Sequence, residues 1–545
     1  MSNQNQSWGI LPTQQDEDNT RAHAVSDPAG YHAGIAGREL HWFDGNTQSW
    51  ISQTDTGEWA GWHDRDASSA HADASWQPWS HPLDDSLAPY YRWFVDGQTN
   101  ACFNLIDRHV LSGRGDQIAI IFEGDRWDPS KNDGRGGPVH EQRVTYRELL
   151  VEVALRTRVL KQADLSCGDR VALNLPNVLE QIFYILACQR LGVIYTPVFG
   201  GFSAKTLSDR IHDAGAKVVI TADGGYRNAE VVPYKSTYTD PALDNYIPRP
   251  AALEALSATL RTRLSADVAE RLEAQVSEAI AGEITLERAD VMRELGLALE
   301  RERGTAPEVI AELRTTVASE LANVGHAVTH VIVIRYTGND IVEHARDFWS
   351  PDLVAQVETD LLADAGVADR AALYALDDTA LWQAVGPHAA AVPVEANWPL
   401  FIIYTSGSTG KPKGVVHTHG GWLSGITHTL RTVFNANQDD CLYVIGDPGW
   451  ITGQSYLIAA PLAFGMSTMI AEGSPLFPHA GRFASIIERN NVTIFKAGST
   501  FLKAVMTDPA STQEMSRYDM SSLKVGTFCA EPVSPTVQQF AMDNI

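Results

Sequence analysis

The stretch that decides the fold runs from Phe401 to Gly414 and reads FIIYTSGSTGKPKG. Residues 401–404 form an apolar run, which is typical of a strand buried on both faces. Six small hydroxyl and glycine residues follow. Because glycine permits tight turns, their backbone N–H groups can converge on phosphate oxygens. The stretch predicts a nucleotide-phosphate loop, in which the expected binding residues are Thr405, Ser406, Gly407, Ser408, Thr409, Gly410, Lys411 and Lys413.

This loop differs from the common P-loop. That pattern places Gly five residues before the Gly-Lys pair and Ser or Thr directly after the lysine. Here the first position is Thr405, and Lys411 is followed by Pro412, which has no N–H to offer a phosphate. The alternative interpretation is a Ser/Gly-rich surface turn between two strands. The order of buried strand, hydroxyls, glycines and lysines favours the phosphate loop.

Strands and helices alternate along the chain before this loop. Residues 171–175 are expected to form a strand, 178–191 a helix and 193–198 the next strand. Thr145 and Glu148 have the spacing of a capping box at the start of an earlier helix. Strands joined through helices form right-handed βαβ units. We therefore expect an α/β fold with mostly parallel sheets flanked by helices.

Length, charge and cysteine content narrow the class of protein. A chain of 545 residues is too long for one ordinary core, so two or more domains or subdomains are expected. The formal charge of −25 argues against a nucleic-acid partner. The five cysteines have neither metal-ligand nor disulfide-framework spacing, which predicts a reduced cytoplasmic protein without a metal site. From the polar N-terminus and the interrupted apolar runs we expect neither a secretory signal nor a membrane span.

Residues 404–414 resemble the signature loop of the acyl-adenylate-forming enzymes, and the flanks resemble the acetyl-CoA synthetase branch of that family. The resemblance covers about residues 90–235 and 325–545. In the family this loop wraps the β- and γ-phosphates of ATP while a carboxylate attacks the α-phosphate. The resulting acyl-AMP then reacts with the CoA thiol, which displaces AMP. The resemblance implies the acyl-adenylate-forming N-terminal domain, with ATP, Mg²⁺ and CoA as cofactors and a short carboxylic acid as substrate.

The resemblance also assigns roles to residues outside the loop. Residues 446–453 resemble the stretch that lines the acyl pocket and the CoA tunnel, and residues 530–532 resemble the turn that holds adenine. Cys529 stands where the family has an aliphatic pocket residue. A thiol there favours a short or hydroxylated acyl group, although a buried filler without reactivity is the favoured interpretation. Thr405 and Lys411 are the expected catalytic residues. The other candidates are Ala530, Glu531, Pro532, Gly201, Arg227 and Thr452 for cofactor binding, and Trp450, Ile451, Thr452 and Cys529 for the substrate pocket.

Two positions depart from the family at the CoA site. Arg227 matches the first of two arginines that meet the phosphates of CoA, but Glu230 stands where the second is expected. Leu476 replaces an asparagine that meets CoA. These departures leave open a second function, in which the acyl group passes to a carrier protein. A third is a non-catalytic nucleotide-binding scaffold.

The chain divides into four predicted parts. Residues 1–85 form an N-terminal extension, 86–250 the first part of the adenylation core, 251–322 an inserted helical subdomain and 323–545 the second part of the core. The insertion has leucine and valine at helical spacing, and its glycines and proline predict about three helices. It is either a packing element or a docking surface for another domain.

The family's C-terminal lid and its second Mg²⁺-ATP motif have no counterpart before Ile545, so we expect the 545-residue chain alone to be incomplete for catalysis. A long helical insertion in a synthetase-like core also resembles the ligase module of propionyl-CoA synthase, a fused enzyme that activates 3-hydroxypropionate. The resemblance implies a ligase acting on 3-hydroxypropionate, propionate or acetate. It also implies docking to further enzyme domains of the same polypeptide, or a homo-oligomer.

Overall fold

The computed structural model describes residues 13–54, 58–61, 75–302, 306–405 and 412–545. One of its two large sheets has seven strands, and every neighbouring pair is parallel except the last, where β22 runs antiparallel to β21. The expected βαβ pattern is confirmed here. In spatial order the strands are β19 (Asp347–Trp349), β18 (His330–Ile334), β13 (Val218–Ala222), β11 (Arg170–Asn174), β12 (Ile194–Pro197), β21 (Pro399–Thr405) and β22 (Lys413–Thr418).

The second large sheet has six strands and is also parallel, apart from its first strand, β10, which runs antiparallel to β7. Its central strands are buried, because helices cover both faces. In spatial order the strands are β10 (Glu141–Thr145), β7 (Ile118–Glu123), β24 (Ser467–Ala471), β23 (Cys441–Val444), β25 (Ile494–Gly498) and β26 (Val525–Cys529).

Two helices, α4 (Tyr146–Gln162) and α5 (Leu179–Leu191), share one hydrophobic core with both sheets. Helix α5 buries every residue but Glu180, as expected of a helix enclosed on all sides. The predicted capping box starts α4: Thr145 accepts from the Glu148 backbone N–H, and the Glu148 carboxylate accepts from the Thr145 N–H. The two sheets are therefore joined into one body through a shared helical layer.

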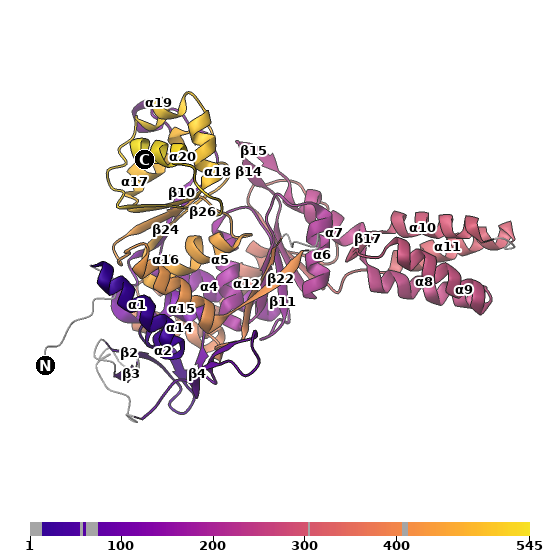
Figure 1. Cartoon of the computed structure of the whole chain (residues 1–545), viewed down its shortest axis with the longest axis horizontal. Coiled ribbons are helices and arrows are strands. Elements are labelled where there is room, and N and C mark those ends of the chain that lie inside the picture. The colour runs from indigo at the N-terminus through magenta and orange to yellow at the C-terminus, as the bar shows by residue number, and fades with distance from the viewer. Residues whose placement is uncertain (1–12, 55–57, 62–74, 303–305, 406–411) are drawn as a thin grey trace.

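The outer faces of the sheets are covered by separate helices. Helix α6 (Ala204–Ala214) packs on the seven-stranded sheet. The far face of the six-stranded sheet packs against α17 (Gly481–Asn490), α18 (Ser499–Thr507) and α20 (Pro535–Asn544). Figure 1 shows these last helices at the top of the body, where the chain ends.

The N-terminal segment packs against the body through aromatic residues. It comprises α1 (Gln14–Ser26), α2 (Pro28–Glu39) and a small antiparallel sheet of β1 (Trp42–Asp44), β2 (Ser49–Gln53) and β3 (Trp59–Gly61). Trp42 is fully buried, and its ring lies 4.8 Å from that of Trp79 and 5.4 Å from that of Phe94. The tryptophans scattered in this part of the sequence anchor it to the core.

Helices α8 (Arg249–Arg263), α9 (Ala266–Ala279), α10 (Arg288–Arg301) and α11 (Pro307–Asn323) surround a hydrophobic core of their own. They project from the body (Figure 1). The prediction of about three helices was wrong: the chain leaves the helical conformation at Leu264 (ψ 165°) and Ser265 (ψ 152°), where no glycine or proline marks the break. That the bundle is an insertion with boundaries at 251 and 322 stays a prediction.

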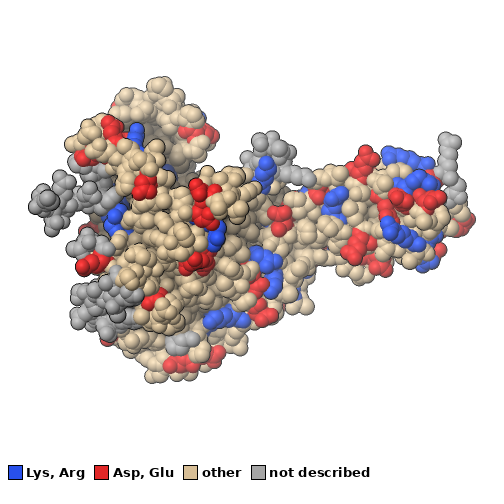
Figure 2. Space-filling model, turned by 60° about the horizontal axis from the view of Figure 1, so that its bottom comes forward, with Lys and Arg blue, Asp and Glu red and all other residues tan. Residues whose placement is uncertain are grey.

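The surface of this bundle is strongly charged. Figure 2 shows basic and acidic side chains interleaved over it. Ion pairs join neighbouring helices, such as Arg261–Glu273 at 2.9 Å and Arg271–Glu302 at 2.6 Å. In the described part of the bundle, Leu297 is the one large hydrophobic side chain that is exposed. The bundle therefore presents a mixed-charge surface rather than an apolar one.

The remaining elements are further helices that pack on the shared core, together with short strands and short helical turns. None of the helices in the described ranges combines the length and the apolarity needed to cross a bilayer. These elements are β4 (His81–Asp84), β5 (Arg92–Val95), β6 (Gln98–Thr99), η1 (Phe103–Asp107), η2 (Val110–Arg114), β8 (Trp127–Asp128), α3 (Lys131–Gly134), β9 (Gly137–Pro138), β14 (Gly225–Arg227), β15 (Glu230–Val232), η3 (Lys235–Thr239), α7 (Asp240–Asp244), β16 (Tyr246–Pro248), β17 (Thr285–Glu287), α12 (Ser350–Ala365), α13 (Arg370–Tyr374), α14 (Asp378–Ala389), β20 (Val394–Glu395), α15 (His419–Thr432), η4 (Gly453–Ala459), α16 (Ala460–Phe464) and α19 (Ser511–Met515).

Candidate active site

The carboxyl ends of the two large sheets meet, and the contact is close. Gly449, after β23, packs so tightly on the turn after β12 that a Cβ placed on it would lie 2.6 Å from the backbone N and Cα of Phe199. Nearby, the Asn177 side chain, which follows β11, donates to the Gly446 carbonyl at 3.2 Å. Ligands of parallel sheets bind outside the carboxyl ends of the strands. This junction is therefore the candidate active site.

The turn after β23 carries three of the predicted pocket residues. Its Asp447 carboxylate accepts from the Gly449 N–H at 2.6 Å, which tightens the turn. Trp450 and Ile451 remain 46% and 41% exposed, although both are large and apolar. The Trp450 ring lies 5.9 Å from that of Phe199, in the turn that also contains the predicted Gly201. The site thus has an open apolar edge that a substrate could cover.

Asp447 has an unusually high pKa for a carboxylic acid. Burial raises its pKa to about 7, although the hydrogen bond from Gly449 and the positive charge of Arg227 both favour the ionised form. Arg227, predicted to bind CoA, therefore lies within electrostatic range of the pocket turn. Perturbed acids of this kind are common in functional sites.

Glu472, after β24, organises the neighbouring loops. Its carboxylate accepts from the Tyr226 N–H at 2.7 Å, the Asp125 N–H at 3.1 Å and the Tyr336 hydroxyl at 2.7 Å. Tyr226 precedes Arg227 in the β14–β15 hairpin, where Arg227 pairs in register with Glu230. The acid that departs from the family pattern therefore lies directly opposite the retained arginine.

The predicted phosphate loop connects β21 to β22. Thr405 and Lys413 are cross-strand partners at its base, and both are exposed. The predicted residues Ser406, Gly407, Ser408, Thr409, Gly410 and Lys411 lie outside the described residues. Below the base, the Tyr404 hydroxyl donates to Asp213 at 2.6 Å, which ties the strand to helix α6.

The predicted adenine turn follows β26, at the edge of the six-stranded sheet. Ala530 has φ +73°, a conformation that glycine adopts without strain and alanine does not. This explains why a glycine is expected at the position. Glu531 accepts from Ser499, Thr500 and Lys503, and the hydrogen bond from Lys503 is the largest influence that lowers its pKa. Pro532 is exposed.

Lys496 is a functional candidate that the sequence analysis missed. It lies on β25, is only 7% exposed, and its ammonium sits 4.9 Å from the Tyr456 ring centroid and 5.3 Å from that of Phe434. Within the described ranges, no carboxylate or other acceptor lies within hydrogen-bonding or ion-pairing distance of this ammonium. A buried lysine without an anion is costly to a folded protein. The signal in the sequence was a lysine inside the apolar run 492–497.

Lys496 lies beside the predicted pocket residue Cys529. In the parallel register Lys496 is opposite Thr527, and Cys529 follows two residues later on the same face of β26. The Thr527 hydroxyl is buried and has no hydrogen-bond partner in the described part of the protein. Tyr456 completes the group, because it lies near Cys529 and one helical turn beyond Thr452. The Lys496 ammonium and the Thr527 hydroxyl, which have no hydrogen-bond partner in the described protein, thus lie beside Cys529, a predicted pocket residue.

Comparison with known proteins defines the class. Residues 108–545 match the family described as "AMP-binding enzyme", and residues 68–105 match "Acetyl-coenzyme A synthetase N-terminus". The chain belongs to the AMP-binding enzyme family. This confirms the predicted resemblance to the adenylate-forming acyl-CoA synthetases, whereas the propionyl-CoA synthase assignment remains a proposal.

Individual relatives carry the name "Acetyl-coenzyme A synthetase". The protein of Methylobacillus flagellatus is 34% identical over 471 residues, which cover 86% of this chain and 54% of the relative. That of Thiobacillus denitrificans is 33% identical over 84% of this chain and 52% of the relative. That of Herminiimonas arsenicoxydans is 32% identical over 96% of this chain and 57% of the relative. The chain therefore spans about half the length of the curated relatives it matches.

Proposed function

We propose that this chain is the adenylation part of an AMP-forming short-chain acyl-CoA synthetase. In this reaction a carboxylate oxygen attacks the α-phosphorus of ATP and pyrophosphate leaves. The CoA thiol then attacks the acyl carbonyl, and AMP leaves. The observation that carries the proposal is the junction of the two sheets, where the Gly449 turn lies against the Phe199 turn in a chain of the AMP-binding family.

Each part of the junction has a role in this proposal. Thr405, Lys413 and the loop between them hold the phosphates of ATP, with Lys411 offsetting the charge of the departing pyrophosphate. Ala530, Glu531 and Pro532 form the adenine end of the site. Mg²⁺, when bound with ATP, would supply further charge neutralisation.

We propose a short acid with a polar end as the substrate, 3-hydroxypropionate in preference to propionate or acetate. The support is Lys496, whose ammonium can donate to a substrate hydroxyl and has no other acceptor in the described protein. Thr527 offers a second unsatisfied group on the same face. A purely apolar acyl group would leave both unsatisfied.

We further propose that the chain is the ligase part of a propionyl-CoA synthase and acts in the cytoplasm. The charged helical bundle suits a surface that faces further enzyme domains, although a homo-oligomer would use it equally well. The five cysteines are all free thiols, which supports a reducing compartment. Carboxylate, ATP and CoA are the proposed small-molecule partners.

A second function, transfer of the acyl group to a carrier protein, is favoured by one observation. Glu230 lies opposite Arg227 in the β14–β15 hairpin and places negative charge where the phosphates of CoA would dock. Release of AMP that depends on CoA supports the synthetase. Release that CoA does not accelerate, but that a carrier protein does, supports the alternative.

The proposed function is tested by ATP–pyrophosphate exchange in the natural protein that contains this chain. The double variant Lys411→Ala with Thr409→Ala is expected to lose exchange by several orders of magnitude, because positioning and charge neutralisation dominate this chemistry. A matched control, Lys161→Met on the exposed end of α4, is expected to retain it. Unchanged exchange in the double variant would remove the loop from the mechanism, and binding of ATP without any exchange would favour a non-catalytic scaffold.

A further inference from the structure

A cavity of about 520 Å³ lies far from the candidate active site. Its walls come from the N-terminal segment, from residues 108–114 in and before η2, and from the segments that precede β23 and β24. These segments lead into the amino ends of their strands, whereas the Gly449 turn follows the carboxyl end of β23. The cavity and the Gly449 turn therefore lie at opposite ends of the strands of the six-stranded sheet. A five-residue strand such as β24 spans about 16 Å. The cavity is therefore not part of the acyl, phosphate or adenine pockets.

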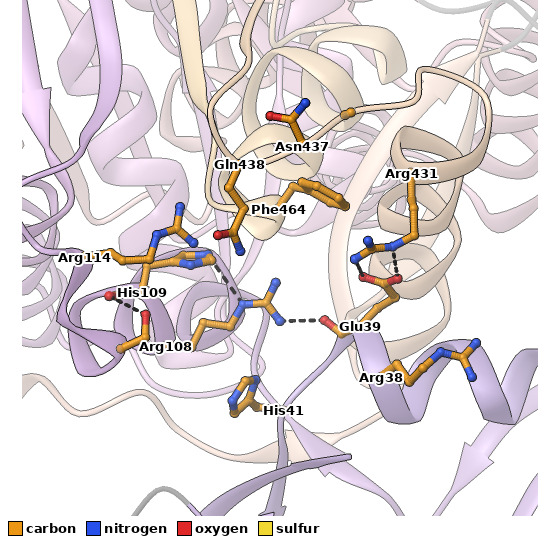
Figure 3. A pocket seen from close by; sticks show the side chains of 12 residues that line it. Arg38, Glu39, His41, Arg108, His109, Arg114, Arg431, Asn437, Gln438 and Phe464 are labelled. Atoms are coloured by element: carbon orange, nitrogen blue, oxygen red, sulfur yellow. Dashed lines mark hydrogen bonds and ion pairs between the residues drawn. The ribbon is translucent and has the colours of Figure 1, made fainter. Parts of the chain in front are cut away.

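Four guanidinium groups and a single carboxylate line the cavity. Figure 3 shows Arg108, His109 and Arg114 on one side and Glu39 with Arg431 on the other. The Glu39 carboxylate is already used, since Arg431 binds it through two hydrogen bonds of 2.6 and 3.0 Å. The whole chain has a formal charge of −25. The arginines around this cavity therefore form a locally positive region in a negatively charged protein.

Arg108 and Arg114 form no ion pair in the described ranges, although Glu39 acts on Arg108 and Asp439 on Arg114 over a longer distance. Arg108 donates to the Glu39 carbonyl at 2.5 Å and to the Ala463 carbonyl, and Arg114 donates to Gln117 at 2.9 Å and to the Gly465 carbonyl. These neutral acceptors hold both head groups in place without neutralising them.

The electrostatics of the cavity agree with that geometry. Burial lowers the pKa of Arg108 to about 10 and lowers that of Arg114 as well. Burial and the nearby Arg108 also hold the pKa values of His41 and His109 well below the ordinary value, so both imidazoles are neutral. Arginine head groups held in a fixed geometry are suited to oxyanions, which they bind through paired hydrogen bonds.

We propose that this cavity binds a small oxyanion with at least two negative charges, of the phosphate-ester or polycarboxylate type. The volume is within the range of small-molecule sites. Arg108 and Arg114 supply the charge, and Asn437, Gln438 and Ser112, which also line the cavity, supply further hydrogen-bonding groups. This site lies at the amino ends of the strands, whereas the candidate active site lies at their carboxyl ends. It is therefore independent of the adenylation chemistry.

The test is calorimetric titration of this chain with inorganic phosphate and, separately, with citrate, at matched ionic strength. We expect binding in the millimolar range or tighter, and at least about tenfold weaker binding by Arg114→Gln. The matched control, Arg293→Gln on the exposed face of α10, is expected to bind like the wild type. Lys413→Ala separates this site from the phosphate loop, because only binding at the loop would be affected.

A preference for phosphate or for citrate says which oxyanion class is the ligand. Because Arg114→Gln removes the donors of three structural hydrogen bonds, to Gln117 and to the Gly465 carbonyl, a crystal soaked with each probe gives a second measurement on the unaltered protein. Density between Arg108 and Arg114 supports the proposal. It is overturned if neither probe binds up to about 10 mM, if Arg114→Gln binds as the wild type does, or if the soaked cavity holds only water.

Discussion

Lys496→Met tests the proposed substrate class most directly. The change keeps an unbranched side chain that is one atom shorter, and it removes the ammonium of a residue that is only 7% exposed. This ammonium has no acceptor in the described protein. If that ammonium donates to a substrate hydroxyl, its loss costs about 1.5–3 kcal/mol of binding, as for other hydrogen bonds to charged groups. This corresponds to about 10- to 150-fold in the dissociation constant.

The variant is also expected to unfold no more easily than the wild type. The two ring contacts of the ammonium, at 4.9 and 5.3 Å, contribute about 1–2 kcal/mol. Burial of a charge without a counter-ion costs several kcal/mol. The free energy of unfolding is therefore expected to stay level or to rise by about 1–2 kcal/mol.

Binding of two acyl-adenylate mimics is the assay, because it needs no turnover. The 3-hydroxypropanoyl and propanoyl sulfamoyl-adenosines differ by one hydroxyl, so the ratio of their dissociation constants isolates the contribution of Lys496. We expect the wild type to prefer the hydroxylated mimic and Lys496→Met to lose that preference. Lys161→Met, which removes an exposed lysine at the end of α4, serves as the control and should keep it.

Three outcomes separate the substrate assignment from the proposed function. If Lys496→Met weakens both mimics equally, or neither, the ammonium does not recognise the hydroxyl and the reasoning is refuted. If the wild type prefers the propanoyl mimic, the substrate is the unsubstituted acid. If neither mimic binds the wild type, the adenylation function itself fails.

The remaining predictions concern the site and its supporting elements. Burial raises the pKa of Asp447 to about 7, against an ordinary value of 3.8, so the folded protein binds more protons between these pH values and its stability falls as the pH rises through that window. Urea unfolding of Asp447→Asn should therefore show about 4 kcal/mol more stability than the wild type at pH 8 and little difference at pH 4; a pH-independent difference would contradict the assignment. Gly449→Ala places a methyl group 2.6 Å from the Phe199 backbone, and thermal unfolding should report a loss of about 1–3 kcal/mol; an unchanged melting temperature would show that the two turns are not in contact. Thr145→Ala removes the cap of α4 and should cost about 1 kcal/mol in chemical denaturation, whereas Thr145→Ser should not; equal losses in both variants would exclude the capping box.

Local signals in the sequence were sufficient for much of the fold. The strand and helix pattern from 171 to 198 and the capping box at Thr145 were predicted correctly, because hydrophobic periodicity and cap geometry act over a few residues. The break at Leu264 was missed, because an extended residue between two helices needs neither glycine nor proline. It is set by the packing of α8 against α9 in the bundle core.

The candidate site required the tertiary structure to a greater degree. The motifs that carry Thr405, Trp450 and Glu531 could be recognised one by one, but their arrangement depends on two sheets meeting at their carboxyl ends. In the sequence, the one signal at Lys496 is a lysine inside an apolar run. Only its burial, and the lack of any acceptor around it in the described chain, make it a candidate for substrate recognition.

The sequence by itself determined the α/β class and the family, and it predicted the position of a phosphate loop, because each is encoded by residues that are neighbours along the chain. Only the tertiary structure decided which distant side chains share an environment. Arg108, Arg114 and Arg431 come from separate segments and surround one cavity, and Asp447 acquires its raised pKa from burial at the junction of the sheets. The reason is physical: desolvation and electrostatic interaction depend on distance in space, and a linear sequence does not contain that distance.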